Sequence, residues 1–175
     1  RKKKDGEFHH YAVSLKYDLD SEEIKVDFYV DGKYNSTHVE TSVQSFNSVL
    51  GYFNGTIGSL ATTKDGSGGL GYGKLSGSLD DVRFWKVARN AQQIGSFYDY
   101  PVFGATDQES ISSDLGLYYK FNEGIFGKAS SDKIILDYSG RINNGEFVGY
   151  SSENRSEDSA ITLSTAASKK EPGVF

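Results

Sequence analysis

Hydrophobic and polar positions alternate through the first forty residues of the chain. Residues 8–18 and 24–30 follow a period of two, which is typical of half-buried β-strands. The positions expected to face a core are Tyr11, Val13, Leu15, Tyr17, Ile24, Val26, Phe28 and Val30, with Lys25, Asp27 and Tyr29 pointing outward. Asp31–Gly32 is the residue pair of a type I′ hairpin turn, and 33–41 is the expected return strand. The pattern predicts an antiparallel sheet.

The middle of the chain predicts shorter and less regular elements. We expect one or two strands within 46–60. The glycine-rich stretch 64–73 lacks the Gly-Lys-Ser/Thr ending of a phosphate-binding loop, so we interpret it as a surface loop. Within 75–87 the hydrophobic positions change from odd to even numbers at Asp80–Asp81. This change predicts a β-bulge or a strong bend.

One helix is expected, at residues 89–98. Its apolar stripe consists of Ala91, Ile94, Phe97 and Tyr98. This stripe covers about two turns of a helix, and Pro101 ends the segment. The polar residues 102–115 predict a linker or a rim loop.

The last third of the chain again predicts short strands, at 116–123, 134–138 and 146–150. The positions expected on one side of the first strand are Leu117, Tyr119 and Phe121. A polar tail follows at 151–175, with a weak strand at 161–163. Many short strands, glycine-containing turns and a single short helix indicate an all-β protein, for which we expect an antiparallel β-sandwich.

Composition narrows the classes of function. The chain has 175 residues, enough for one domain with a sizeable core. It has no Cys, which excludes disulfide scaffolds, zinc–thiolate sites and thiol nucleophiles. A net charge of −5 gives no attraction to nucleic acid, and no apolar run approaches the ~20 residues of a membrane helix. The chain also has no Met, so we expect residue 1 to be an internal position of a longer protein.

Four strings of residues stand in a distinctive order along the first half of the chain. They are His-His-Tyr-Ala-Val-Ser (9–14), Phe-Tyr-Val-Asp-Gly (28–32), Gly-Ser-Leu-Asp-Asp-Val-Arg-Phe-Trp (77–85) and Ala-Arg-Asn-Ala-Gln-Gln-Ile (88–94). In order and spacing they resemble the second half of a laminin-G-like, concanavalin A-like jelly-roll module. Gly-Leu-Tyr-Tyr-Lys-Phe-Asn-Glu-Gly (116–124) and Asp-Tyr-Ser-Gly-Arg-Ile-Asn-Asn-Gly (137–145) resemble the segment that opens such a module.

The resemblance implies an antiparallel jelly-roll β-sandwich with one short helix. Residues 1–101 would be the C-terminal part of the module, 102–115 a linker or rim loop, and 151–175 a polar tail. Residues 116–150 would either close this module or open a second copy. Phe-Asn-Glu-Gly and Asp-Tyr-Ser-Gly-Arg also resemble large virion structural proteins of tailed phages, particularly marine cyanobacterial phages.

Jelly-roll relatives include glycoside hydrolases, which need two carboxyl groups facing each other across the substrate. The chain has no run of alternating carboxylates on one strand face. Asp80 and Asp81 are adjacent and point to opposite faces of a regular strand. We therefore predict no enzyme. Asp81 is expected to bond to loop amides or to pair with Arg83 or Arg89.

Calcium is the one metal that the sequence suggests, because it takes carboxylate and amide oxygens on rim loops. The candidate ligands are Asn122, Asp137, Asn143 and Asn144. The favoured interpretation of these residues is turn capping, since they match no fixed ligand spacing. His9, His10 and His38 are expected to be structural.

Exposed aromatic side chains on a sandwich can stack against sugar rings. The candidates are Tyr29, Tyr34, Tyr72 and Trp85. The first hypothesis is a carbohydrate-binding or adhesion module of an extracellular or virion protein, ordered or not by calcium, with a cell-surface glycan as its partner. The alternative is a structural virion module that contacts neighbouring protein chains. Neither hypothesis involves nucleic acid or insertion into a membrane.

Overall fold

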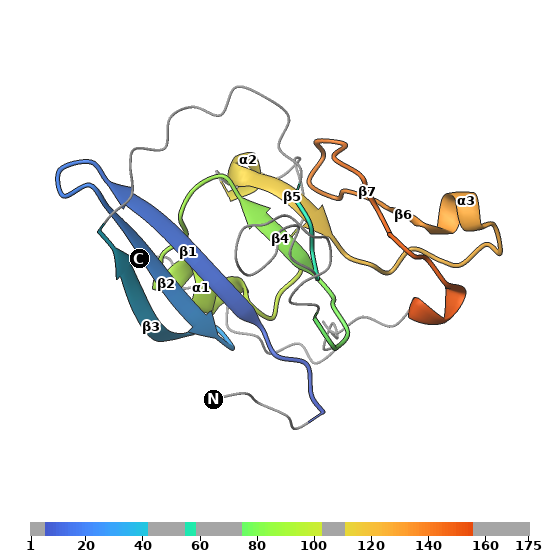
Figure 1. Ribbon diagram of the computed structural model, residues 1–175, viewed down its shortest axis with the longest axis horizontal. Helices are drawn as coiled ribbons and strands as arrows, with labels where there is room; N and C mark the ends of the chain where they lie inside the picture. Colours follow the sequence, from blue (N-terminus) through green and yellow to red (C-terminus); the bar gives the residue numbers. More distant parts are fainter. Residues whose placement is uncertain (1–5, 42–54, 59–74, 103–110, 156–175) are drawn as a thin grey trace, which may run out of the picture. The chain divides into compact units, whose positions relative to one another are not determined.

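The computed structural model describes residues 6–41, 55–58, 75–102 and 111–155 (Figure 1). The chain divides into two compact units, Arg1–Val43 with Asp80–Phe175, and Gln44–Leu79. In the second unit the amide of Leu75 donates to the carbonyl of Gly58 over 2.7 Å, and its described residues include no strand. The following predicted elements lie outside the described residues: the strands within 46–60 (except for residues 55–58), the loop 64–73 and the weak strand 161–163.

Three strands of the first unit form the antiparallel sheet that the alternation predicts. They are β1 (Tyr11–Asp18), β2 (Glu23–Val30) and β3 (Lys33–Glu40), in the order β1-β2-β3. Asp31 and Gly32 join β2 to β3 with φ angles of 49° and 72°. These left-handed conformations are what a type I′ turn requires, so the predicted hairpin is confirmed.

The sheet buries the face that we expected to point outward. Ser14, Asp27 and Tyr29 are 4%, 7% and 4% exposed. The cause lies outside the strands, because the Ser14 hydroxyl donates to the carbonyl of Arg89 (2.9 Å), and the helix that follows Arg89 contacts β3. The Arg89 carbonyl thus lies on the side of the sheet that carries Ser14, Asp27 and Tyr29.

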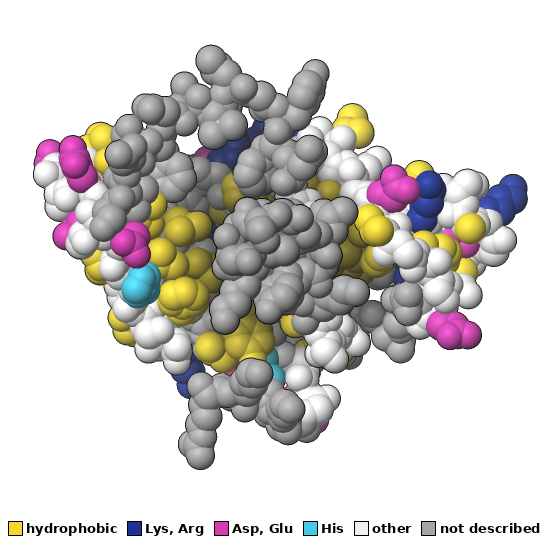
Figure 2. Space-filling view, in the orientation of Figure 1, with side chains coloured by type: hydrophobic (Ala, Val, Ile, Leu, Met, Phe, Trp, Pro, Cys, Tyr) yellow, Lys and Arg dark blue, Asp and Glu magenta, His cyan; other side chains and the backbone are white. Residues whose placement is uncertain are grey.

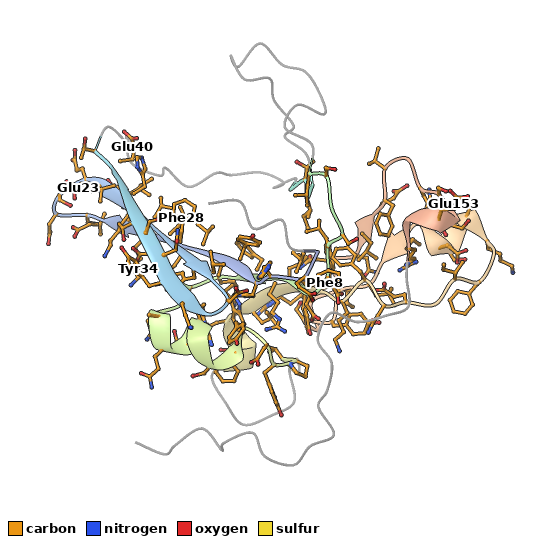
Figure 3. All side chains as sticks on the ribbon, turned by 90° about the horizontal axis from the view of Figure 1, so that it is seen from below. Phe8, Glu23, Phe28, Tyr34, Glu40 and Glu153 are labelled. Carbon is orange, nitrogen blue, oxygen red and sulfur yellow. The ribbon has the colours of Figure 1, made fainter. Side chains whose placement is uncertain are left out.

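The opposite face of the sheet is apolar and exposed among the described residues. The cross-strand pairs on it are Tyr11–Val30, Val13–Phe28, Leu15–Val26 and Tyr17–Ile24. The most exposed members are Tyr11 (64%), Leu15 (60%), Val13 (54%) and Phe28 (39%). Figure 3 shows Phe28 on the side of the sheet away from α1, and Figure 2 shows hydrophobic side chains gathered over this sheet. The predicted periodicity is therefore correct, but the predicted burial of this face is wrong.

The predicted helix is α1 (Ala91–Phe97), with Ile94 as its buried residue. Asn90 caps its first turn: the Asn90 side chain accepts from the amide of Gln93 (2.8 Å), and the Gln93 side chain accepts from the amide of Asn90 (3.0 Å). This reciprocal arrangement is a capping box and fixes where the helix begins. No helix in the described part of the chain is long and apolar enough to cross a membrane.

A second, two-stranded sheet joins β4 (Val82–Trp85) to β5 (Leu115–Tyr119). β4 occupies only part of the stretch 75–87, and the predicted bend is confirmed, since Asp81 has a φ of 50°. Trp85 pairs with Leu115 while Phe84 pairs with Leu117, so Gly116 is an extra residue in β5. A Cβ at Gly116 would lie 3.0 Å from the Phe84 ring.

This bulge at Gly116 decides which side chains of β5 enter the core. It puts Leu115 (0% exposed) and Tyr118 (1%) into one cluster with Val102, against which Trp85 and Tyr138 pack. Leu117 and Tyr119 lie on one side of the strand, opposite Phe84 and Val82, as the alternation predicted. Phe121 follows the end of the strand, and its ring lies 6.0 Å from that of Tyr119.

The remaining elements are short. They are α2 (Ile111–Asp114), α3 (Ala129–Asp132), β6 (Ile134–Ile135), β7 (Gly145–Glu146) and the 3-10 turn Ser152–Asn154. The strands expected at 134–138 and 146–150 shrink to the β6–β7 pair, and α2 occupies part of the expected linker 102–115. Small helices thus accompany α1, which corrects the expectation of a single helix. Among the described residues, strands in antiparallel sheets still outweigh the short helices, which is consistent with a concanavalin A-like β-sandwich.

Candidate functional site

Two of the four aromatic candidates lie together at a bulge between β2 and β3. Phe28 pairs with Ser36 and Tyr29 with Tyr34, so one extra residue of β3 brings the two tyrosines opposite each other. Their ring centroids are 6.0 Å apart at 78°. Tyr29 is buried and offers no ring face to a ligand, whereas Tyr34 is 57% exposed.

The exposed ring of Tyr34 is fixed at both ends. Its edge meets the buried Tyr29, and its phenol oxygen lies 2.8 Å from the hydroxyl of Thr37. The Thr37 hydroxyl in turn donates to the carboxylate of the buried Asp27 over 2.5 Å. Tyr34 is therefore an oriented aromatic side chain on the surface of β3, the edge strand of the sheet.

Trp85 packs into the core, while its neighbour Phe84 is 58% exposed. The guanidinium carbon of Arg89 lies 4.2 Å from the centroid of the Trp85 ring. Arg89 is itself buried, and burial lowers its pKa, an effect that the charge of Asp114 opposes. A ring covered by a cation and by the core is poorly placed to stack on a sugar. The fourth aromatic candidate, Tyr72, lies outside the described residues.

Asp81 joins β4 to β5 through polar contacts. Its carboxylate accepts from the Tyr118 hydroxyl (2.5 Å) and lies 3.5 Å from the guanidinium of Arg83. Burial, together with this hydrogen bond, raises the pKa of Tyr118 to about 12. Arg83 also donates to the carbonyls of Phe97 (2.9 Å) and Tyr100 (2.8 Å). The expected structural role of Asp81 is confirmed, with Arg83 as its cation.

Asp137 organises the turn that we considered for calcium. Its carboxylate accepts from the amides of Tyr118 (3.0 Å), Ser139 (2.9 Å) and Asn143 (3.0 Å), and from the Ser139 hydroxyl (2.8 Å). Burial alone would raise the pKa of Asp137, but these hydrogen bonds outweigh it and lower the pKa below 3.8. Both carboxylate oxygens are thus engaged by protein donors.

The three asparagines of the expected calcium set do not converge on Asp137 as ligands. The Asn144 side chain accepts from the amide of Asp137 (2.9 Å), and the Asn143 amide group donates to the carbonyl of Gly116 (3.4 Å). Asn122 is exposed. Among the described residues, no group of three or more His, Asp and Glu side chains could hold a metal ion. This geometry fits turn capping, and calcium binding itself stays a prediction.

A buried ion pair escaped the sequence analysis. The guanidinium of Arg155 lies 2.5 Å from the carboxylate of Glu123, and the two side chains are 2% and 8% exposed. Arg155 also donates to the carbonyl of Asp132, whose carboxylate accepts from the amide of Phe126 (3.0 Å). Glu123 and Arg155 are separated by 32 residues, so no local pattern marks them as partners.

These elements define an all-β protein built from short antiparallel strands with a few short helices. The family model described as the concanavalin A-like lectin/glucanases superfamily, in its laminin-G form, matches residues 2–95, more than half of the chain. The chain therefore belongs to this superfamily, as the resemblance predicted. No curated protein and no solved structure gives a significant match. A phage origin stays a prediction.

Proposed function

We propose that the chain is part of a non-catalytic carbohydrate-binding module, which works in adhesion within a larger extracellular or virion protein. The observation that carries the proposal is Tyr34, 57% exposed on the edge strand of a lectin-like fold. A tyrosine ring presents an apolar face with a polar tip, a combination suited to stacking on a sugar ring.

The surroundings of Tyr34 support the same function. Thr37 lies on the same face of β3 as Tyr34 and supplies a hydroxyl beside the ring, 2.8 Å from its phenol oxygen. Because Tyr29 and Thr37 already hold the ring, a sugar would meet a surface that loses little side-chain freedom on binding. The proposed ligand is a cell-surface glycan, and neither nucleic acid nor a membrane is part of the proposal.

The carboxylates support a non-catalytic module. Asp81 is engaged by Tyr118 and Arg83, and Asp137 by three donors of its own turn and by the amide of Tyr118. A hydrolase needs two carboxyl groups free to reach the substrate. Carboxylates tied to protein donors are better suited to holding strands and turns together.

The apolar face of β1 and β2 supports the jelly-roll sandwich as the complete fold. Antiparallel sheets bury their apolar face against another layer. In this proposal a second sheet of the module covers the cross-strand pairs from Tyr11–Val30 to Tyr17–Ile24. The pairing of β5 with β4 further supports the arrangement in which 116–150 close this module.

Glycan-array binding of the 175-residue chain tests the function. Binding is expected, and Tyr34→Ala is expected to weaken it about five- to twelvefold, since stacking of a ring is worth about 1–1.5 kcal/mol. Tyr100→Ala is the matched control, because Tyr100 is 45% exposed but lies outside the sheet. Equal losses in both variants, or no binding by folded protein, would contradict the proposal. Repeating the array with calcium and with chelator decides whether a metal takes part.

Exposed apolar side chains in the last third of the chain favour the structural alternative. Phe126, Ile142 and Val148 are 77%, 81% and 101% exposed. Such side chains suit contact with a neighbouring protein chain. In the intact parent assembly, this alternative predicts chemical cross-links from Lys128 or Lys133 to another chain, together with an absence of glycan binding.

A further inference from the structure

Three segments of the first unit meet at the Asp31–Gly32 turn. The His9 ring nitrogen Nδ1 lies 3.2 and 3.1 Å from the two carboxylate oxygens of Asp31. The amide of His10 donates to the same carboxylate (3.1 Å), and the amide of Asp31 donates to the carbonyl of His10 (2.8 Å). Two consecutive histidines thus hold the turn against the residues that lead into β1.

The end of α1 packs against the other side of this turn. A Cβ at Gly32 would lie 2.4 Å from the Tyr98 ring, and one at Gly95 would lie 3.2 Å from the carbonyl oxygen of Gly32. The ring of His10 lies on the same tyrosine, with centroids 5.8 Å apart. His10 therefore stands where the start of β1, the turn and the end of α1 come together.

The surroundings of the His10 ring favour its neutral form. Its Nδ1 atom is buried and has no hydrogen-bond partner in the structure. The charged groups that face it are Arg83 of β4, Asp31 of the turn and Asp99 after α1, with His9 next to it in the chain. Burial and the charge of Arg83 lower the pKa of His10 below 6.5, and the two carboxylates oppose this effect.

We propose that His10 is the pH-sensitive element of a latch, in which the neutral ring locks the Asp31–Gly32 turn to Tyr98 and the protonated ring leaves this contact. A protonated ring needs an acceptor at Nδ1, which the buried position does not supply. His9 keeps its contact with the Asp31 carboxylate when protonated, because a charged ring still donates to it. Acid thus frees the end of α1 while the turn stays attached to β1.

The direction in which stability changes with pH follows from the numbers of protons that the folded and the unfolded chain bind. Because the pKa of His10 is lowered in the folded protein, the unfolded chain binds more protons near pH 6. The contribution of His10 to stability is complete above pH 6.5, the ordinary value. It is lost progressively as the pH falls through 6.5 towards the lower pKa of the folded state.

Amide hydrogen exchange of the 175-residue chain at pH 7.5 and pH 5.5, corrected for the intrinsic rates, tests the latch. The protection of the amides of Gly32 and Tyr98 is expected to fall more than about threefold at the lower pH. In His10→Gln, which cannot titrate, protection is expected to be the same at both pH values. His38→Gln is the matched control, since the His38 side chain is 67% exposed, and it should behave like the wild type.

A ring titration of the wild type by NMR keeps the test decisive if His10→Gln fails to fold. The His10 ring should titrate with a midpoint below 6.5, and the amide shifts of Gly32 and Tyr98 should move with that midpoint. Loss of protection in His10→Gln equal to that of the wild type would overturn the proposal. So would amide shifts that follow another midpoint.

Discussion

Two regions of one unit are held together by different chemistry. The β1–β3 sheet follows a regular alternation, and its cross-strand pairs from Tyr11–Val30 to Tyr17–Ile24 place apolar side chains on one face. The segment 111–155 has only short elements, and side chains bonded to its backbone hold it instead. Asp137 accepts four hydrogen bonds, three from its own turn and one from β5, and Glu123 forms a buried ion pair with Arg155.

The difference between the two regions shows which stabilising interactions can be inferred from a sequence pattern. Alternation reports strand formation and register, because both depend on neighbouring residues. A buried carboxylate and its hydrogen-bond partners produce no periodic pattern in the sequence. Removing such a carboxylate lowers the stability more than removing one exposed apolar side chain does. The irregular segment should therefore be the more sensitive of the two to single substitutions.

The largest expected effect is the loss of the buried ion pair. Arg155→Met leaves the Glu123 carboxylate, 8% exposed, without its cation. We expect the free energy of unfolding to fall by about 3–5 kcal/mol in urea titrations. Adding Glu123→Gln to Arg155→Met should recover part of this loss, because the uncompensated charge is gone.

The exposed pair Lys133–Glu146 is the matched control for this prediction. Its two side chains are 41% and 62% exposed, at a distance of 2.8 Å. Lys133→Met should cost about 1 kcal/mol or less. Similar costs for Lys133→Met and Arg155→Met would show that the Glu123–Arg155 pair is not buried in solution.

Gly32 tests how tightly the regular region is packed at its turn. Gly32→Ala strains a φ of 72° and drives a methyl group into the Tyr98 ring. The two effects should together cost about 2–4 kcal/mol. Gly6→Ala is the control, since Gly6 has a φ of 83° and nothing within 4 Å of an added Cβ.

Calorimetry of Gly32→Ala and Gly6→Ala measures the Tm of each variant. Gly6→Ala should lower Tm only by the backbone cost, about 1–2 kcal/mol in stability. If both variants lost the same stability, the contact between Gly32 and Tyr98 would be absent, and the latch proposed for His10 would lose its support.

The two regions differ in how much of their structure could be predicted from the sequence. The hairpin at Asp31–Gly32 and the stripe of α1 were predictable, since each depends on residues close in the chain. Which face of the sheet is buried was not predictable. It depends on the carbonyl of Arg89, which lies 75 residues from Ser14 in the chain and accepts a hydrogen bond from the Ser14 hydroxyl. Gly116 also escaped prediction, since a bulge depends on how β4 and β5 pair.

The candidate site shows the same division. Turn capping by Asp137 was predictable, because most of its donors lie within six residues. Trp85 and Phe84 are neighbours in the chain, and only the structure shows that Trp85 packs against the core while Phe84 is exposed. Tyr29 and Tyr34 look alike in sequence, and the bulge between them buries one and exposes the other.

Asp137→Asn probes the turn of the irregular region. The amide group cannot accept from all four donors, and we expect a loss of about 1.5–3 kcal/mol at pH 7. Because the pKa of Asp137 is lowered in the folded state, its stabilisation is present above pH 3.8 and is lost as the pH falls through the folded pKa. Urea titrations should therefore show the wild type and the variant converging in acid. A difference that is constant with pH would contradict the charged role of Asp137.

The smallest expected effect lies on the apolar face of the sheet. Leu15 is 60% exposed, so Leu15→Ala should cost about 1 kcal/mol or less in the 175-residue chain. The same substitution at Leu115, which is 0% exposed, should cost about 2–5 kcal/mol and serves as the reference for a filled core. Equal costs at both positions in urea titrations would mean that Leu15 is covered in solution. The apolar face of the sheet would then be buried, as the core beside Trp85 is. The two regions would differ in the interactions that hold them together but not in how completely they are packed.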